Sequence, residues 1–337
     1  EKADLCVSVG IKETELLKNI TYESGYSLYV GIPFCPSTCL YCSFTSYPIS
    51  AYREYADHYL DALIREIHYI GEQYRDREMI SLYVGGGTPT TLSPEQLERL
   101  FGELKRCFDF GRVREITVEA GRPDSITAEK LSVLSENGVT RISINPQTMN
   151  NDTLRKIGRN HTAEDVADSF HAARKAGFDN INMDTICGLP GEGIRELETT
   201  FKALGELEPD SITVHALAIK RSAPLNQMRD QFSCGADDEM IRFAQRACFD
   251  LGMEPYYMYR QKNIPGNFEN TGFSLEEKEC LYNILIMEEL HDIIAAGAGA
   301  SSKIVGGRRN IQRVENLKDV RQYTERIEEM ILRKDKL

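Results

Sequence analysis

The sequence predicts an α/β protein: an incomplete (β/α)6 TIM-like barrel followed by a C-terminal mixed α/β appendage. Short apolar segments typical of buried strands alternate with amphipathic helical segments, which indicates a parallel sheet with right-handed crossovers. The strand segment recurs six times, and the pattern becomes less regular from Ala223 on. Polar or glycine-rich residues follow the strands, at the end where barrel enzymes place their active sites.

These patterns divide the 337 residues into three predicted parts. Residues 1–25 form a polar lead-in with a helical turn, residues 26–222 form the partial barrel, and residues 223–337 form the appendage on the substrate side. The net charge of −12 argues against nucleic acid as a partner, since phosphate binding needs a basic surface. Without an apolar run of roughly 18 residues or a secretory segment, we expect a cytoplasmic protein that does not enter membranes.

The strands of the barrel are predicted where apolar residues form short runs. They are expected at residues 28–34, 79–84, 115–120, 141–145, 180–186 and 211–218. Helices are predicted where apolar residues recur every three to four positions, at residues 50–74, 94–108, 127–137, 162–176 and 193–207.

Local signals fix some of these boundaries. Ser93, Pro94 and Gln96 have the composition of a capping box at a helix start. Gly138 and Gly177 follow the third and fourth helices as C-terminal caps. In the appendage we expect a helix over 237–251, a strand over 255–259, a helix over 274–289 and an apolar segment over 293–300.

Three cysteines follow the first strand directly, with the spacing C-x3-C-x2-C. A tight loop of this size can turn the sulfurs of Cys35, Cys39 and Cys42 toward one point. Thiolates suit iron–sulfur clusters, which normally take four protein cysteines. Three thiolates would leave one iron open to a ligand from outside the protein.

Two other uses of these cysteines fit less well. A zinc site needs four ligands, often as two C-x2-C pairs, and the remaining cysteines are scattered singly. A disulfide framework is typical of small secreted domains, and a chain of this length needs no such cross-links. The spacing therefore favours a cluster.

Further polar and glycine-rich residues stand at successive strand ends. The run from Gly85 to Pro89 lets a ligand approach the backbone closely. Glu119, Gln147, Arg159 and Asp184 lie on or just after later strands. A carboxylate on a buried strand is costly unless it is paired or meets a ligand. Four such residues at matching positions favour a bound polar ligand over hydrogen bonds confined to the barrel rim.

Together these motifs resemble the oxygen-independent coproporphyrinogen III oxidase (HemN-like) family of radical S-adenosylmethionine (SAM) enzymes. The matching segments are Tyr29-x-x-Ile32-Pro33-Phe34-Cys35, Gly85 to Thr90, Val118-Glu119, Gln147 with Arg159, and Asp184 with Gly188-Leu189-Pro190. The later segments Tyr257 to Asn263 and Gly297 to Ala300 are similar to the HemZ branch of that family.

The resemblance implies a [4Fe–4S] cluster on Cys35, Cys39 and Cys42, with SAM chelating the open iron. The SAM-binding residues that it implies are Tyr29, Tyr41, Gly86, Gly87, Thr88, Glu119, Gln147, Arg159 and Asp184.

Each of these residues has an implied role. The glycine run meets the methionyl end of SAM, with Glu119 and Arg159 near its amino and carboxylate groups. Gln147 and Asp184 bind ribose hydroxyls, and the backbone around Tyr41 meets the adenine. Tyr29, the expected catalytic residue, lies at the cluster and SAM.

The resemblance also implies a tetrapyrrole substrate and a flavodoxin- or ferredoxin-type electron donor. In the oxidase, propionate side chains lose CO2 and become vinyl groups. Tyr257, Tyr259, Arg260 and Lys262 would line the substrate pocket, or else belong to a tyrosine-rich strand packed under the barrel. We expect His161 near SAM, whereas His215 fits a hydrogen-bonded core residue better.

Two positions depart from the oxidase pattern. Phe44 stands where the oxidase has a fourth cysteine, and Gly31 where it has a histidine. Two alternatives to the oxidase therefore stay open: a haem- or porphyrin-binding, chaperone-like protein, and a radical SAM enzyme with another substrate. The H-N-x-x-Y-W motif of the haem chaperone does not follow Asn263, which argues against the first of them.

Overall fold

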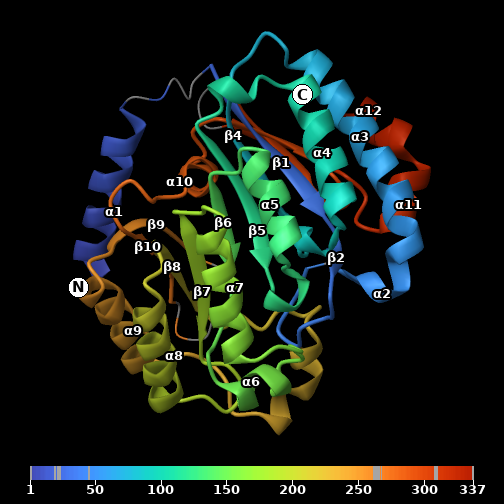
Figure 1. Cartoon of the computed structure of the whole chain (residues 1–337). Helices are drawn as coiled ribbons and strands as arrows, with labels where there is room; N and C mark the ends of the chain where they lie inside the picture. Colours follow the sequence, from blue (N-terminus) through green and yellow to red (C-terminus); the bar gives the residue numbers. More distant parts are fainter. Residues whose placement is uncertain are drawn as a thin grey trace.

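The computed structural model describes residues 2–18, 20, 24–44, 46–260, 266, 268–306 and 310–335, and a single large sheet forms its centre (Figure 1). Neighbouring strands of the barrel part run parallel, which confirms the predicted βα repeat. They are β1 (Tyr26–Ile32), β4 (Met79–Gly86), β5 (Glu115–Gly121), β6 (Arg141–Ile144), β7 (Ile181–Cys187) and β8 (Ser211–Ala216).

The five predicted barrel helices are present. They are α3 (Ala56–Gln73), α4 (Pro94–Cys107), α5 (Ala128–Glu136), α7 (Ala163–Lys175) and α8 (Ile194–Leu207). Figure 1 shows α4, α5 and α7 side by side over one face of the sheet. The capping box of α4 is confirmed, because Ser93 Oγ accepts from Gln96 N at 3.2 Å and Gln96 Oε1 accepts from Ser93 N at 3.0 Å. Such a box satisfies two backbone donors that a helix start leaves free.

Short elements fill the connections. They are β2 (Phe34–Cys35), β3 (Tyr47–Pro48), α2 (Ile49–Tyr52), α6 (Asn151–Lys156) and the 3-10 turns η1 (Arg53–Tyr55), η2 (Pro89–Thr91), η3 (Phe110–Arg112), η4 (Pro123–Ser125) and η5 (Pro224–Gln231). The predicted helix over 50–74 is therefore interrupted at η1.

The C-terminal part extends the same sheet at both edges. Its elements are α9 (Asp238–Asp250), β9 (Glu254–Tyr259), β10 (Asn270–Ser274), α10 (Leu281–Met287), β11 (Asp292–Ala296), β12 (Ser301–Gly306), β13 (Asn310–Glu315), α11 (Val320–Glu325) and α12 (Ile327–Lys334). The strand order is β13-β12-β11-β1-β4-β5-β6-β7-β8-β10-β9. β11 is parallel to β1, whereas β10 is antiparallel to β8. The division of the chain at residue 222 stays a prediction.

Two sequence-based expectations are wrong. The helix predicted over 274–289 is confined to α10, because residues 270–274 are buried and pair with β8 and β9, and Glu277 adopts a positive φ of 62° that a helix does not allow. The lead-in is more than a turn: it forms α1 (Lys2–Leu17), which packs on β9 and buries Leu5 and Val9. Among the described helices, none is both long and apolar enough to cross a membrane.

Candidate functional site

A cavity of about 360 Å³ opens at the carboxyl ends of the barrel strands. The three cysteines of the C-x3-C-x2-C loop line it together with residues from β4 to β8. The predicted residues that line it are Cys35, Cys39, Cys42, Tyr41, Gly86, Gly87, Thr88, Glu119, Gln147, Arg159 and Asp184. Tyr29, the predicted catalytic residue, lies outside this lining. The fold thus brings together side chains that lie up to 149 residues apart in the sequence, from Cys35 to Asp184.

The cysteine loop has the chemistry of a cluster site. All three cysteines are free, and a 3.1 Å hydrogen bond from Cys42 N to Cys39 O makes the loop turn tightly. Burial raises the pKa of the Cys35 thiol, and it raises that of Cys42 to about 11. Iron would therefore displace protons on binding, as thiolate ligation requires. Within the described residues, no three His, Cys, Asp or Glu side chains converge closely enough for a single metal ion. Three thiolates that each bind a different iron have no need to converge so closely.

The glycine run is hydrogen-bonded to the strand that leads into the cysteine loop. Gly87 N donates to Ile32 O at 2.8 Å, and Thr88 N donates to Phe34 O at 2.7 Å. Thr88 Oγ1 lies 3.5 Å from Cys35 Sγ. A Cβ atom on Gly87 would come within 2.5 Å of Phe34 O, so only glycine fits there. The two predicted ligand-binding loops therefore form one unit.

Glu119 lies beside the glycine run. Its carboxylate accepts the Tyr83 hydroxyl at 2.6 Å and Gly86 N–H at 3.1 Å. Burial raises its pKa to about 7, although these hydrogen bonds act in the opposite direction. A carboxyl group poised in this way can accept a hydrogen bond from an amino group.

Arg159 and Gln147 also line the cavity. Arg159 is buried, and its guanidinium donates to Tyr41 Oη at 3.0 Å and to the carbonyl of Asn145. Gln147 has a positive φ of 67°, and its backbone N–H bonds to Asp184 O at 2.9 Å. Its Oε1 is buried with no hydrogen-bond partner among the described residues. An orphan acceptor in a cavity wall fits a ligand that brings a donor, such as a hydroxyl.

Asp184 lies on β7, beside His215 of β8. Asn182 Nδ2 donates to its Oδ1 at 2.7 Å, and His215 Nε2 lies 3.6 Å from its Oδ2. Burial alone would raise the pKa of Asp184, but His215 and Asn182 outweigh burial and lower it. The Asp184 carboxylate therefore stays ionised, and it can accept hydrogen bonds from the hydroxyl groups of a diol.

Tyr29 is placed differently from the other predicted residues. It lines a smaller neighbouring cavity of about 260 Å³, which shares Gly86, Gly87 and Phe44 with the main one. Its ring stacks with those of Tyr83 and Tyr282, with centroids 6.1 and 6.3 Å apart. Its position at cluster and SAM stays a prediction.

Only some of the residues expected in the substrate pocket line the main cavity. Tyr257 and Tyr259 line the main cavity, whereas Arg260 lies outside the lining and pairs with Glu269. Lys262 falls outside the described residues. His161 is buried at 4.0 Å from Asp124 and does not line the cavity.

Several site residues were missed in the sequence. The expectation for His215 is wrong, since it lines the cavity beside Asp184, and Tyr259 Oη lies 3.4 Å from its Nδ1. Alternating polar residues on the last three parallel strands also face the cavity. They are Arg141 and Ser143 on β6, Asn145 directly after it, Asn182 on β7, and Thr213 and His215 on β8. A period-two polar pattern in these strands is the signal that identifies them.

Comparison with known proteins agrees with this geometry. The model of the Radical SAM superfamily matches residues 29–204. The chain is 43% identical over 309 residues to the oxygen-independent coproporphyrinogen-III oxidase-like protein HemZ of Bacillus subtilis. This match covers 90% of this chain and 62% of HemZ. It is 32% identical over 317 residues to the heme chaperone HemW of Lactococcus lactis, which covers 91% of this chain and 78% of HemW.

One solved structure shares the fold over almost the whole chain. It is the coproporphyrinogen III oxidase HemN of Escherichia coli, a radical SAM enzyme, with a TM-score of 0.74 and 24% identity. The superposition covers 98% of this chain and 73% of HemN. The chain thus spans less than two thirds of the length of HemZ and about three quarters of that of HemN.

Proposed function

Because this chain belongs to the HemN-like family of radical SAM proteins, on its HemZ branch, we propose that it decarboxylates propionate side chains of a porphyrinogen oxidatively. Membership in the superfamily brings a [4Fe–4S] cluster and SAM as cofactors. The observation that carries the proposal is a single cavity that holds three free cysteines together with acidic, amide and guanidinium groups.

Cys35, Cys39 and Cys42 would hold the cluster at the rim of this cavity. When bound, the cluster would pass one electron to SAM, whose cleavage would give methionine and a hydrogen-abstracting 5′-deoxyadenosyl radical. The residues of the chain position SAM for that chemistry. Glu119 accepts a hydrogen bond from the amino group, and the buried Arg159 pairs with the carboxylate.

The cavity would also hold SAM through its ribose. Gln147 Oε1 has no hydrogen-bond partner among the described residues, and it would accept a hydrogen bond from one ribose hydroxyl. The ionised Asp184 would accept a hydrogen bond from the other. With both ends held, the 5′-carbon would be fixed relative to the substrate. Such orientation is the main contribution that a protein makes to cofactor chemistry.

A tetrapyrrole with carboxylate side chains fits the remaining lining. Tyr257 and Tyr259 are stacked with centroids 6.2 Å apart and offer an apolar face, and His215 adds a polar edge. Lys220, also in the lining, supplies positive charge for a propionate. A flavodoxin- or ferredoxin-type protein would deliver the electron.

The proposal is tested by an anaerobic assay of cluster-loaded protein with a reductant, SAM and coproporphyrinogen III, followed by mass spectrometry. We expect 5′-deoxyadenosine and a tetrapyrrole that has lost two carboxyl groups, both abolished by Cys39→Ala. Formation of 5′-deoxyadenosine with an unchanged tetrapyrrole would reject the substrate while leaving the radical chemistry intact.

A haem-binding, chaperone-like role is the second candidate, and one observation favours it. Phe44 is 69% exposed at the mouth of both cavities, where it offers an aromatic surface to a flat ligand. The assay separates the two functions. Stable haem binding and transfer to an acceptor protein, with no 5′-deoxyadenosine formed, would favour the chaperone.

A further inference from the structure

Arg122 reaches from the end of β5 to the cysteine loop. It follows Gly121, whose φ is +57°, and precedes η4. The turn is fixed by Ser125, whose Oγ donates to Arg122 O at 2.8 Å. The Arg122 side chain is 3% exposed although it carries a charge. A buried guanidinium at this position therefore depends on the partners that it meets there.

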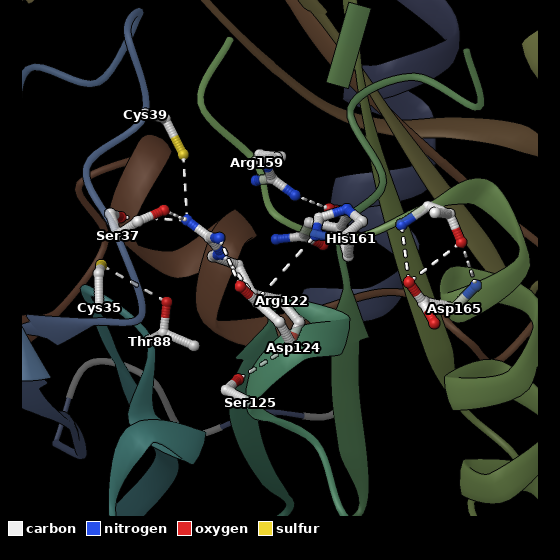
Figure 2. Close-up of polar contacts among 12 residues, drawn as sticks. Cys35, Ser37, Cys39, Thr88, Arg122, Asp124, Ser125, Arg159, His161 and Asp165 are labelled. Atoms are coloured by element: carbon white, nitrogen blue, oxygen red, sulfur yellow. Dashed lines mark hydrogen bonds and ion pairs between the residues drawn. The ribbon is translucent and has the colours of Figure 1, made fainter. Parts of the chain in front are cut away.

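Its first partner is the loop that carries the cysteines. Arg122 Nη1 donates to Ser37 O at 3.0 Å and to Ser37 Oγ at 2.9 Å, and it lies 3.6 Å from Cys39 Sγ (Figure 2). Ser37 Oγ also lies 3.0 Å from Gly158 O, which anchors the loop on the opposite side. Arg122 thus donates to a sulfur that would be a cluster ligand.

Its second partner fixes the direction of that donor. Arg122 Nε and Nη2 donate to the two carboxylate oxygens of Asp124 at 2.9 and 2.6 Å, a bidentate pair. With those two nitrogens occupied, Nη1 is left to face the loop, as Figure 2 shows.

Behind Asp124 lies His161, at 4.0 Å and almost completely buried. Neither of its ring nitrogens has a hydrogen-bond partner in the described part of the chain. Burial, and then the nearby Arg159 charge, lower the pKa of His161 to about 4, so the ring is neutral at physiological pH. His161 therefore adds no positive charge beside Asp124.

From this arrangement we infer that Arg122, oriented by Asp124, is a positioning residue that raises the reduction potential of the cluster through its hydrogen bond to Cys39 Sγ. One-electron reduction adds negative charge that the thiolate sulfurs share. A donor aimed at one sulfur stabilises the reduced form, and hydrogen bonds to sulfur are among the factors that set cluster potentials. The inference rests on the cluster site proposed above.

Asp124 acts in the opposite sense. Its negative charge partly cancels that of Arg122 near the cluster, while its geometry aims the donor. Asp124→Asn keeps one acceptor oxygen for Arg122 but removes the negative charge, so it should shift the potential upward, whereas removing the arginine should shift it downward. A purely structural role would not produce this pattern, because damage to the loop would affect both variants alike.

The test is an anaerobic redox titration of cluster-loaded protein, followed by electron paramagnetic resonance of the reduced cluster, with dithionite as the electron source. We compare Arg122→Gln and Asp124→Asn with the wild type. Arg174→Gln is the matched control, because Arg174 of α7 also forms an ion pair with a carboxylate, that of Asp210. Iron and sulfide content is measured for every variant.

For Arg122→Gln we expect the ratio of reduced to oxidised cluster at a fixed potential to fall at least about tenfold, which is about 59 mV for one electron. Asp124→Asn should raise the same ratio, and Arg174→Gln should leave it unchanged. If Arg122→Gln fails to hold a cluster, the Asp124→Asn variant alone tests the inference. An unchanged or lowered ratio of reduced to oxidised cluster in Asp124→Asn would then overturn it.

Two further outcomes are distinguishable. Unchanged potentials in both variants, or a fall in both, would overturn the role of Arg122 and leave the proposed function standing. A wild-type protein that takes up no [4Fe–4S] cluster would instead contradict the proposed cluster site itself.

Discussion

Glu119, which we propose accepts a hydrogen bond from the SAM amino group, has an environment that changes its pKa. Its carboxyl group is buried between a tyrosine hydroxyl and a glycine N–H, and this burial raises its pKa to about 7. A ligand that donates a hydrogen bond prefers the ionised carboxylate. Binding below pH 7 must therefore include the cost of removing a proton from Glu119.

We therefore predict that SAM binding by the cluster-loaded protein strengthens with pH. Between pH 6 and pH 8 the ionised fraction of Glu119 rises about tenfold, so the affinity for SAM should rise about tenfold and then level off. Glu119→Gln should weaken binding at pH 8 about tenfold and flatten the pH profile. Anaerobic calorimetric titration at several pH values measures both effects, and a flat wild-type profile would contradict the assigned role.

Single site residues could be predicted from the sequence where both the residue type and its position in the chain pointed to a ligand. The three cysteines, Glu119 and Asp184 stand out because closely spaced thiols, and acids inside apolar strands, seldom occur without a ligand or a paired charge. Arg122 does not stand out, since its partners Ser37 and Cys39 approach only through tertiary folding. His215 looks like a core residue until the neighbouring strand places Asp184 beside it.

At the scale of elements, the loop after β4 and strand β2 behave as one unit. Backbone hydrogen bonds join Gly87 and Thr88 to Ile32 and Phe34, and a methyl group on Gly87 would meet Phe34 O. Any displacement of the glycine run would therefore move Cys35, which follows Phe34 directly.

Gly87→Ala should consequently lower cluster occupancy as well as SAM binding, both by about tenfold or more. Gly102→Ala is the matched control: it lies within α4, where a Cβ meets nothing within 4 Å, and it should stabilise the protein by about 0.5–1 kcal/mol. Iron and sulfide analysis with SAM titration measures the first effect, and urea unfolding the second. Full cluster occupancy in Gly87→Ala would rule out this coupling.

The regular βα units were predictable because each helix and strand carries its own periodicity and caps. In the C-terminal part, α9 and β9 were predicted in the same way, whereas the elements after β9 were not. The predicted helix over 274–289 begins only at Leu281, because Ser274 pairs in β10 and Glu277 has a positive φ. The pairing of Ser274 is a non-local contact that local sequence does not encode. Likewise, no signal in the local sequence indicates that β11 pairs with β1.

At the scale of the whole molecule, the end of the chain is tied to its first barrel helix by a buried polar network. Glu66 of α3 accepts Gly297 N at 2.8 Å, Asn316 Nδ2 at 2.8 Å and Tyr323 Oη at 2.6 Å, and it pairs with Lys334 Nζ. The network holds the loop after β11, which borders the smaller cavity.

Glu66→Ala should lower the free energy of unfolding by about 3–5 kcal/mol, because it leaves the buried Lys334 ammonium without its counter-charge. Glu328→Ala is the control on the same pair of helices, since its ion pair with Arg65 is exposed and should contribute little. Urea midpoints from circular dichroism compare the two variants, and equal midpoints would show that the network is dispensable.

The most direct test of the central claim uses coproporphyrinogen III deuterated at the propionate β-carbons. Cluster-loaded, reduced protein is incubated with SAM and this substrate without oxygen, and the 5′-deoxyadenosine is analysed by mass spectrometry. If the cavity directs the radical to a propionate, 5′-deoxyadenosine gains one deuterium as CO2 is lost. Unlabelled 5′-deoxyadenosine beside an intact tetrapyrrole would contradict it.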